Sequence, residues 1–318
     1  MKALVTGAAG MIGRKLSQRL ADDHELILHD VVSCGPGSVV SDLSTPGEAE
    51  KLVAARPDVV FHLAAIVSGE AEADFEKGYR INLDGTRQLF EAIRKEGGGA
   101  AGPYRPRVVF ASSIAVFGAP FPDAIGDEFL NAPLTSYGTQ KAIGELLLSD
   151  YSRRGIFDGI GLRLPTICVR PGKPNKAASG FFSGIIREPL AGQEAVLPVP
   201  ETVRHWFASP RAAISFLMHA LTMKTDPLGS RRNLSMPGLS LTVGEQIESL
   251  RRVAGDKVAA LIRRQPDATI MKIVEGWPRN FDPRRALSLG FRGDASFDEI
   301  IRIHLEDEKI PAPRASSA

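Results

Sequence analysis

The residues best suited to do chemistry are Tyr137 and Lys141, spaced Tyr-x-x-x-Lys in the string YGTQK. A helix is predicted to begin near Ser136, and residues four positions apart on a helix project from one face. A phenol with an ordinary pKa of about 10 is a poor base at neutral pH, but a nearby cation stabilises the phenolate and lowers that pKa. We expect Tyr137 to take a hydroxyl proton while hydride leaves for a nicotinamide, with Lys141 as the activating cation.

Ser113 is expected beside this pair. It lies in FASSIAVFG at the end of a predicted strand, 107–113, and the carboxyl ends of parallel strands form the ligand crevice of such sheets. Its hydroxyl can orient a substrate oxygen and stabilise charge that develops there. The alternative is a strand-end serine that only caps the next turn.

A glycine-rich string, TGAAGMIG, places Gly7, Gly10 and Gly13 between the first strand and the first helix. The glycines allow a tight turn, close approach of a pyrophosphate and close helix packing, while the helix N-terminus faces the phosphates. The alternative is a structural turn, but the place between a strand and a helix favours dinucleotide binding. Met11 and Ile12, at the head of this helix, are expected to contact the cofactor.

Asp30 ends the second predicted strand, 17 residues after Gly13. A carboxylate at that place accepts both ribose hydroxyls of NAD and repels the 2′-phosphate of NADP. Arg14 is the one feature that favours NADP, and its alternative role is that of a solvated helix residue. The sequence therefore predicts NAD as the cofactor.

Further cofactor contacts are expected after the third and fourth strands. Asp42 and Leu43 could meet the adenine, although a turn or helix-capping aspartate is an equal interpretation of Asp42. His62 is better explained as a buried, hydrogen-bonded imidazole than as a catalytic base. Ser68 could touch ribose or substrate. Along the expected cofactor path after His62 lie Leu63, Ala64 and Ala65.

Positioning these residues requires a parallel sheet wrapped by helices. The first half of the chain alternates β-branched runs with helical spacing, which is typical of an α/β, Rossmann-type doubly wound fold. The predicted strands span 3–6, 25–30, 38–42, 58–65 and 107–113. Residues 1–165 are predicted to form the NAD-binding domain with the catalytic Ser, Tyr and Lys.

Beyond Pro165, repeated prolines interrupt the pattern, and loops and short elements are expected. Residues 166–310 are predicted to form mainly a small substrate-binding lobe, with some segments returning to the sheet and helical patterns over 242–255 and 297–308. Residues 311–318 are predicted to be a disordered tail.

Composition narrows the class of protein. The 318 residues carry 39 Lys and Arg against 37 Asp and Glu, a net charge of +2, so a concentrated basic face for nucleic acid is not expected. Cys34 and Cys168 are too few for a disulfide framework, and no CxxC pair suggests a metal site. The opening MKALVTGAAG lacks the pattern of a signal peptide, and no run of 18 apolar residues occurs. We expect a cytoplasmic protein without membrane spans that acts on a small molecule.

Taken in order, TGAAGMIG, HLAA, NLDGT, SSIAVFG, YGTQK and LRLP resemble the extended short-chain dehydrogenase/reductase family, also called the NAD-dependent epimerase/dehydratase family. The resemblance implies that Ser113, Tyr137 and Lys141 form the catalytic triad, with Lys141 also binding the nicotinamide ribose. It implies that Asn82 supports the active-site hydrogen-bond network. It also implies that the segment from Leu164 to Thr166 lies next to the carboxamide group of the nicotinamide. It also implies a homodimer through helices around 82–96 and 137–151.

Departures from the family pattern bear on the substrate. Ile114 and Ala115 stand where the sugar dehydratases of the family carry an acid pair, so water elimination is not expected. Arg204 is expected to clamp an anionic group, a carboxylate or a phosphate, because a guanidinium matches both. His205 replaces the acid that follows it in sugar-nucleotide enzymes.

The segment from Arg163 to Glu194 resembles a subgroup of the family that acts on four-carbon sugar acids such as D-erythronate. This implies NAD-dependent oxidation of the C2 hydroxyl to a 2-oxo acid, with Asn175 and Ser179 as pocket contacts, although both could equally stabilise loops. One alternative is a nucleotide-sugar 4-epimerase with tightly bound NAD. The other is a non-catalytic NAD(H)-sensing protein. The expected substrate contacts are Ser68, Ser113, Tyr137, Asn175, Ser179 and Arg204.

Overall fold

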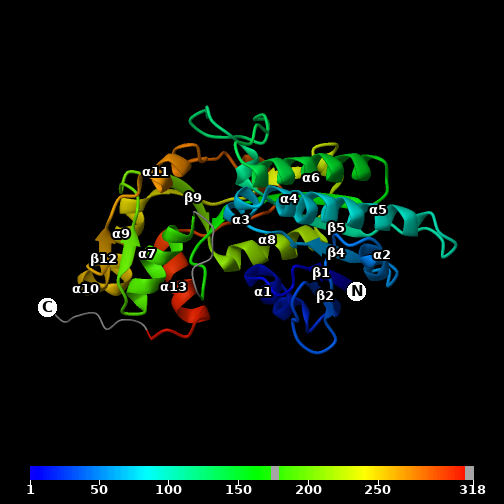
Figure 1. Ribbon diagram of the computed structural model, residues 1–318, viewed down its shortest axis with the longest axis horizontal. Helices are drawn as coiled ribbons and strands as arrows, with labels where there is room; N and C mark the ends of the chain where they lie inside the picture. The colour runs from blue at the N-terminus through cyan, green and yellow to red at the C-terminus, as the bar shows by residue number, and fades with distance from the viewer. Residues whose placement is uncertain (173–178, 312–318) are drawn as a thin grey trace.

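The computed structural model describes residues 1–172 and 179–311, and its centre is a sheet of seven parallel strands (Figure 1). The strand order is β10-β6-β5-β4-β1-β2-β3, which confirms the predicted doubly wound α/β fold. The strands are β1 (Lys2–Thr6), β2 (Glu25–Asp30), β3 (Val39–Val40), β4 (Val59–His62), β5 (Arg107–Ser113), β6 (Asp158–Leu164) and β10 (Asn233–Ser235).

Both faces of the sheet are covered by helices, because successive side chains of each strand point to opposite faces. In β1, Ala3 and Val5 join one apolar cluster with helices α1 (Met11–Leu20) and α8 (Pro210–Thr222). Leu4 joins the cluster on the other face with α2 (Glu48–Val53), α5 (Gly85–Gly97) and α6 (Ser136–Arg153). In Figure 1, α5 and α6 lie on one side of the strands, and α1 and α8 on the other.

Shorter elements connect β4 to α5 and β5 to α6. They are α3 (Ser68–Ala73), α4 (Phe75–Gly78), a π-helical segment (Tyr79–Asp84) that runs into α5, and a short 3₁₀ turn (Ile114–Val116) after β5. The helix predicted to begin near Ser136 is confirmed as α6.

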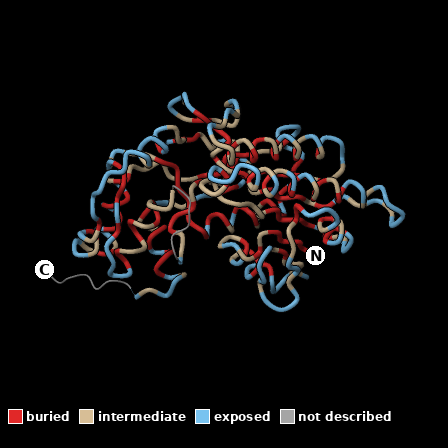
Figure 2. Tube along the Cα trace, viewed as in Figure 1, coloured by how far each residue is buried: buried red, intermediate tan, exposed pale blue. Residues whose placement is uncertain are grey.

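The C-terminal part forms a second lobe, which lies at the end of the molecule farthest from the N-terminus (Figure 1). A three-stranded sheet combines β7 (Thr166–Ile167), β9 (Arg204–Ala208) and β11 (Leu239–Thr242), and a pair joins β8 (Ala195–Leu197) to β12 (Ile262–Arg264). Its helices are α7 (Gly180–Leu190), α9 (Val243–Ala254), α10 (Asp256–Ala259), α11 (Ala268–Glu275) and α13 (Phe297–Asp307), whereas α12 (Arg284–Ser288) packs against β10 of the large sheet. Buried residues form a separate core here, visible as the buried trace in Figure 2.

The chain does not divide cleanly at Pro165. Strand β10 pairs with β6 at the edge of the large sheet, and α8 packs against α1. The segment from Pro210 to Ser235 therefore belongs structurally with the N-terminal part. An 11-residue helix, α7, occupies part of the stretch expected to consist of loops and short elements. Apart from Pro311, the predicted tail 311–318 lies outside the described residues.

The site is positioned by the strand order. From β1 the sheet grows one way through β2 and the other way through β4, so the connections leave the carboxyl ends of β1 and β4 in opposite directions. Such a reversal opens a crevice beyond the carboxyl ends of the strands. Strand β4 ends at His62, and the irregular segment that follows it lines this crevice through Leu63 and Ala65. Within 1–172 and 179–311, no helix is long and apolar enough to cross a membrane, and no cluster of three metal-ligating side chains occurs.

Candidate active site

A cavity of about 820 Å³ extends from the glycine-rich turn, past the carboxyl ends of the central strands, into the C-terminal lobe. Fourteen of the predicted site residues line it, a number that includes contacts for cofactor, catalysis and substrate. They are Gly7, Gly10, Met11, Ile12, Gly13, Leu63, Ala65, Ser68, Ser113, Tyr137, Lys141, Leu164, Thr166 and Ser179.

The glycine-rich turn fits a dinucleotide because side chains have no room there. Gly7 has a φ of +76°, and a Cβ on it would lie 2.7 Å from the Ala64 nitrogen. A Cβ on Gly13 would lie 2.1 Å from the Gly7 carbonyl oxygen. The turn therefore passes close to the β4 connection, and the N-terminus of α1 opens directly on the cavity, where backbone N–H groups and the helix dipole favour phosphates.

Asp30 lies at the end of β2 and braces the turn, because its Oδ2 accepts a hydrogen bond from the Ala9 N–H at 2.9 Å. Burial and the charge of Asp30 raise the pKa of the nearby Cys34 thiol, and Arg14 lowers it. The charges of Asp30 and Arg14 therefore both lie near the Cys34 thiol, at the end of the cavity where the ribose is expected. Asp30 itself does not line the cavity.

Tyr137 and Lys141 lie in the first two turns of α6, whose N-terminus is capped by the Thr135 hydroxyl accepting from the Gly138 N–H at 3.0 Å. The Lys141 Nζ lies 5.8 Å from the centre of the Tyr137 ring and donates to the Ala111 carbonyl at 2.8 Å. Burial lowers the pKa of Lys141 to about 8, while Glu145 acts in the opposite direction. The Lys141 ammonium is thus held between β5 and α6, beside the Tyr137 phenol.

The Tyr137 phenol faces competing influences. Burial raises its pKa, whereas a hydrogen bond with Ser113 and the charge of Arg170 lower it. The Ser113 oxygen accepts from the Ala115 N–H at 3.2 Å, so its own proton remains available to the phenol or to a substrate oxygen. Ser113 and Tyr137 therefore converge on one point, where an alcohol can exchange its proton.

Asn82 is buried in the π-helical segment and does not line the cavity. Its Oδ1 accepts from the Ile66 N–H at 2.8 Å, and its Nδ2 donates to Gln140 Oε1 at 2.8 Å. Asn82 therefore connects the segment at Ile66, which lines the cavity just before Ser68, to the helix that carries Tyr137. In this structure it is a positioning residue.

His62 has the hydrogen bonds of a buried structural imidazole, as its sequence position suggested. Its Nδ1 lies 2.8 Å from the Thr6 hydroxyl and its Nε2 lies 2.8 Å from the Thr86 hydroxyl. Thr86 donates its own proton to the Asn82 carbonyl, so the Nε2 carries a hydrogen and Thr6 donates to Nδ1. Burial lowers the pKa of His62 to about 3, and the ring is neutral at pH 7.

Glu145, one helical turn after Lys141, was not anticipated from the sequence. Its buried carboxylate accepts from Ser112 Oγ at 2.6 Å, from Arg163 Nη2 at 2.7 Å and from Asn131 Nδ2 at 3.0 Å. These contacts join the ends of β5 and β6, next to Ser113 and to the cavity wall. No local pattern reveals the network, because its members come from four separate segments.

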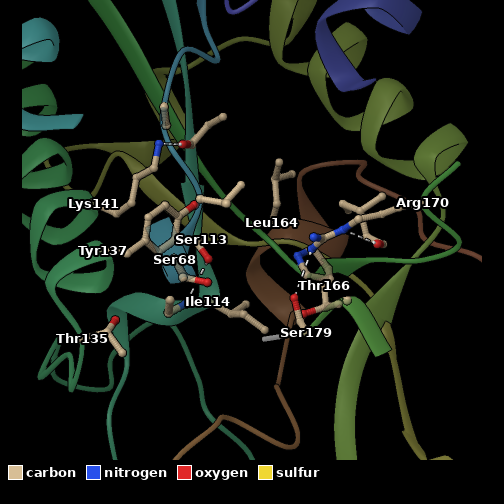
Figure 3. A pocket seen from close by; sticks show the side chains of 18 of the residues that line it. Ser68, Ser113, Ile114, Thr135, Tyr137, Lys141, Leu164, Thr166, Arg170 and Ser179 are labelled. Atoms are coloured by element: carbon tan, nitrogen blue, oxygen red, sulfur yellow. Dashed lines mark hydrogen bonds between the residues drawn. The ribbon is translucent and has the colours of Figure 1, made fainter. Parts of the chain in front are cut away.

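The far end of the cavity carries Arg170, opposite Tyr137 and Ser113 (Figure 3). Its guanidinium donates to the Ile167 carbonyl at 3.2 Å and to the Ser179 hydroxyl at 3.4 Å. Burial lowers its pKa, and no carboxylate within the described part of the chain acts on it. A partly buried cation without an acidic partner is suited to an anionic ligand.

Arg204, the anion contact expected from the sequence, does not line the cavity. Its guanidinium donates to the Ser240 carbonyl at 2.8 Å and pairs with Glu245 at 3.2 Å. Because neighbouring residues of a strand face opposite sides, His205 of β9 faces the cavity while Arg204 faces away. The expectation that Arg204 lines the pocket is therefore corrected, and Arg170 lines the cavity instead.

Some other predicted contacts lie outside the cavity wall. The Asp42 carboxylate is occupied by Ser44 and Arg80, in agreement with the turn interpretation. Leu43 is buried in the core, and Ala64 touches the glycine turn only through its backbone. Asn175 lies outside the described residues. Among the cavity residues not named above as expected contacts are Arg187 of α7, Lys272 of α11 and Trp277, which follows α11.

Comparison with known proteins now bears on this geometry. The family model "NAD dependent epimerase/dehydratase family" matches residues 3–224. The chain belongs to this family. Membership confirms the predicted family, the Rossmann-type fold and NAD as the cofactor, for which the glycine turn supplies the cradle.

Two relatives in the NAD dependent epimerase/dehydratase family are named D-erythronate dehydrogenase. The one from Cupriavidus necator is 47% identical over 96% of this chain and 98% of its own length. The one from Haemophilus influenzae is 41% identical over 96% of this chain and 99% of its own length. A solved structure described as the nucleoside-diphosphate-sugar epimerase from Agrobacterium tumefaciens is 64% identical, with a TM-score of 0.92 over 97% of this chain and 94% of that chain.

Proposed function

We propose that this protein is an NAD-dependent dehydrogenase that oxidises the C2 hydroxyl of D-erythronate to a 2-oxo acid. The observation that carries the proposal is Arg170, a partly buried guanidinium across the cavity from Tyr137 and Ser113. A carboxylate bound there would bring the adjacent C2 hydroxyl toward the phenol. The two D-erythronate dehydrogenases, similar along almost the whole chain, support the same substrate.

The chemistry divides among few side chains. Ser113 and Tyr137 hold the C2 oxygen, and Tyr137 takes the hydroxyl proton as the carbon–oxygen double bond forms. NAD, when bound, supplies the acceptor for the hydride that leaves C2. The Lys141 cation stabilises the phenolate form of Tyr137, and Arg170 fixes the carboxylate so that the reacting atoms stay aligned.

A nucleotide-sugar 4-epimerase is the second candidate, favoured by the description of the 64% identical solved structure. An epimerase returns the hydride to its substrate, whereas a dehydrogenase releases one NADH for each substrate oxidised. We would incubate the protein with NAD and a panel of aldonic acids and sugar nucleotides, and follow NADH absorbance. Stoichiometric NADH with D-erythronate supports the dehydrogenase, and conversion of a sugar nucleotide without net NADH overturns it.

The role of Arg170 can be tested against Arg204, an arginine of β9 with its own partners. Each charge-assisted hydrogen bond contributes about 1.5–3 kcal/mol, so Arg170→Ala should lower kcat/KM for D-erythronate about 10- to 100-fold. Arg170→Lys should lie between, because it keeps the charge and loses the planar fork. Arg204→Ala, the matched control, should change kcat/KM less than threefold. A larger loss in the Arg204 variant would return the anion contact to β9.

We also propose a cytoplasmic homodimer paired through α5 and α6. In the first of the two helices that the family resemblance implied for the interface, Leu89, Phe90 and Ile93 pack in the subunit's own core. Leu146 on α6 is 69% exposed, so its side chain is available to contact a second subunit. Light scattering should give about twice the subunit mass of 34.2 kDa, and Leu146→Glu should shift it toward one subunit. A wild-type mass of one subunit contradicts the dimer.

A further inference from the structure

His205 is a buried histidine in the cavity wall that the mechanism above does not use. It lies on β9, is 3% exposed and stacks on Phe182 with 5.0 Å between ring centres and 3° between planes. Its Nδ1 lies 2.9 Å from the Pro278 carbonyl oxygen, and its Nε2 lies 2.6 Å from the Thr166 hydroxyl. Thr166 also lines the cavity, so His205 acts on the cavity through Thr166.

The partners of His205 determine where its hydrogen sits. A carbonyl oxygen only accepts hydrogen bonds, so the Nδ1 beside Pro278 must carry the hydrogen. Burial lowers the pKa of His205 to about 4, with the charge of Arg170 contributing. The ring is therefore neutral at pH 7, and its Nε2 has only a lone pair to offer. The Thr166 hydroxyl must donate its proton to that nitrogen.

Thr166 consequently has no proton left for a ligand. Toward the cavity its oxygen offers only lone pairs, and it can accept a hydrogen bond but cannot donate one. Arg170, whose charge acts on both His205 and Tyr137, is a pure donor on the same side of the cavity (Figure 3). This wall therefore combines a fixed donor for an anion with a fixed acceptor for a hydroxyl.

We propose that His205 and Thr166 form a specificity-determining pair whose fixed acceptor binds a hydroxyl group on the carbon chain of the acid held by Arg170. The inference rests on the proposed function and deepens it. A sugar acid carries such hydroxyls beside its reacting carbon, whereas a simple 2-hydroxy acid that fills the cavity leaves the Thr166 acceptor without a partner. An unpaired buried polar group lowers affinity for the wrong substrate.

The test compares substrates and variants together. D-erythronate has hydroxyls at C2, C3 and C4, and the matched analogues are 2,4-dihydroxybutyrate, 2,3-dihydroxybutyrate and 2-hydroxybutyrate with the same C2 configuration. Thr166→Val should lower kcat/KM for D-erythronate about tenfold, mainly through KM, as expected for one hydrogen bond. For the analogue that lacks the bound hydroxyl, the same variant should lose less than twofold. Thr166→Ser, which keeps the hydroxyl, should retain wild-type selectivity.

His205→Phe keeps an aromatic ring for stacking and removes the acceptor that orients Thr166. It should reduce selectivity for D-erythronate over the deoxy analogue, and the double variant with Thr166→Val should be no less selective than Thr166→Val alone. Equal losses for D-erythronate and every analogue would overturn the inference. Weaker NAD binding in Thr166→Val with unchanged substrate selectivity would also overturn it, because the nicotinamide amide would then be the bound donor.

A second measurement needs no variant to fold. In the wild-type protein with ¹⁵N-labelled histidine, nuclear magnetic resonance should show His205 neutral at pH 7, with hydrogen on Nδ1 alone. A charged ring or hydrogen on Nε2 contradicts the fixed acceptor. If the proposed function is wrong, the result is different: the wild-type protein turns over none of the four acids. In that case the ligand assigned to Thr166 is wrong as well.

Discussion

Lys141 holds its ammonium 5.8 Å from the centre of the Tyr137 ring while it is anchored on the Ala111 carbonyl of the neighbouring strand at 2.8 Å. One residue thus reaches from α6 to β5 and keeps a positive charge beside a buried phenol. Helical spacing alone brings the two side chains to one face, and the strand carbonyl then holds the ammonium there.

Tyr137→Phe should abolish turnover and leave NAD binding nearly unchanged, because the phenol acts on the substrate whereas the glycine turn cradles the phosphates. A general base contributes about 10²- to 10⁴-fold to rate. We would measure kcat with D-erythronate and NAD affinity by fluorescence. Retention of more than about a tenth of kcat would show that another group takes the proton.

Lys141→Met should shift the pH dependence of kcat to higher pH and weaken NAD. Burial raises the pKa of Tyr137, and the hydrogen bond with Ser113 and the charge of Arg170 lower it. Loss of the adjacent Lys141 cation removes a further stabilisation of the phenolate, so the phenolate should form only at higher pH. The pH–rate profile and the NAD dissociation constant are measured together. An unchanged profile with unchanged affinity would make Lys141 a structural residue only.

Asp30 has two separable roles, which Asp30→Asn and Asp30→Ala distinguish. The asparagine keeps an oxygen for the Ala9 N–H and removes the charge, whereas the alanine removes both. Both variants should bind NAD more weakly and NADP better than the wild type, because the repulsion of the 2′-phosphate is gone. Asp30→Ala should also lower the melting temperature. A wild-type protein that already prefers NADP would contradict the charge argument.

His62 should make the protein sensitive to acid. Burial lowers its pKa from 6.5 to about 3 in the folded state. Between pH 6.5 and pH 3, His62 is therefore protonated in the unfolded chain and neutral in the folded protein. Stability is then lost as pH falls from 6.5 toward 3, by about 2 kcal/mol at pH 5 from this one group.

The readout for His62 is the difference in the free energy of unfolding between pH 7 and pH 5, by urea titration. In His62→Asn this difference should shrink by about 2 kcal/mol, even though the variant is less stable at pH 7 through its lost hydrogen bonds. Equal differences in wild type and variant would mean that His62 is charged in the folded protein.

Much of the candidate active site was predictable from the sequence, because the patterns that indicate its residues are local. The spacing of Tyr137 and Lys141 becomes one helix face, and the three glycines become one turn, whatever the rest of the chain does. Continuous apolar runs predicted the buried parallel strands, although β3 and β4 proved shorter than their apolar neighbourhoods suggested. Strand ends then placed Ser113 at the crevice.

Only the tertiary structure shows which arginine lines the cavity. Arg170 and Arg204 lie in the same stretch of sequence and have the same chemistry, but the pairing of β9 with β11 turns Arg204 toward Ser240 and Glu245. Similarly, His205 meets Thr166 only because β9 pairs with β7, which brings together residues 39 positions apart.

The amino-acid sequence by itself therefore determined the fold class, the cofactor turn and the Ser113, Tyr137 and Lys141 set, since helix periodicity and strand alternation act over a few neighbouring residues. Only the tertiary structure decided that Arg170 faces the cavity, that Glu145 braces β5 and β6, and that the chain returns to the sheet through β10. The physical reason is that strand pairing over long separations sets which side chains face each other, and that pairing leaves no mark in the local pattern.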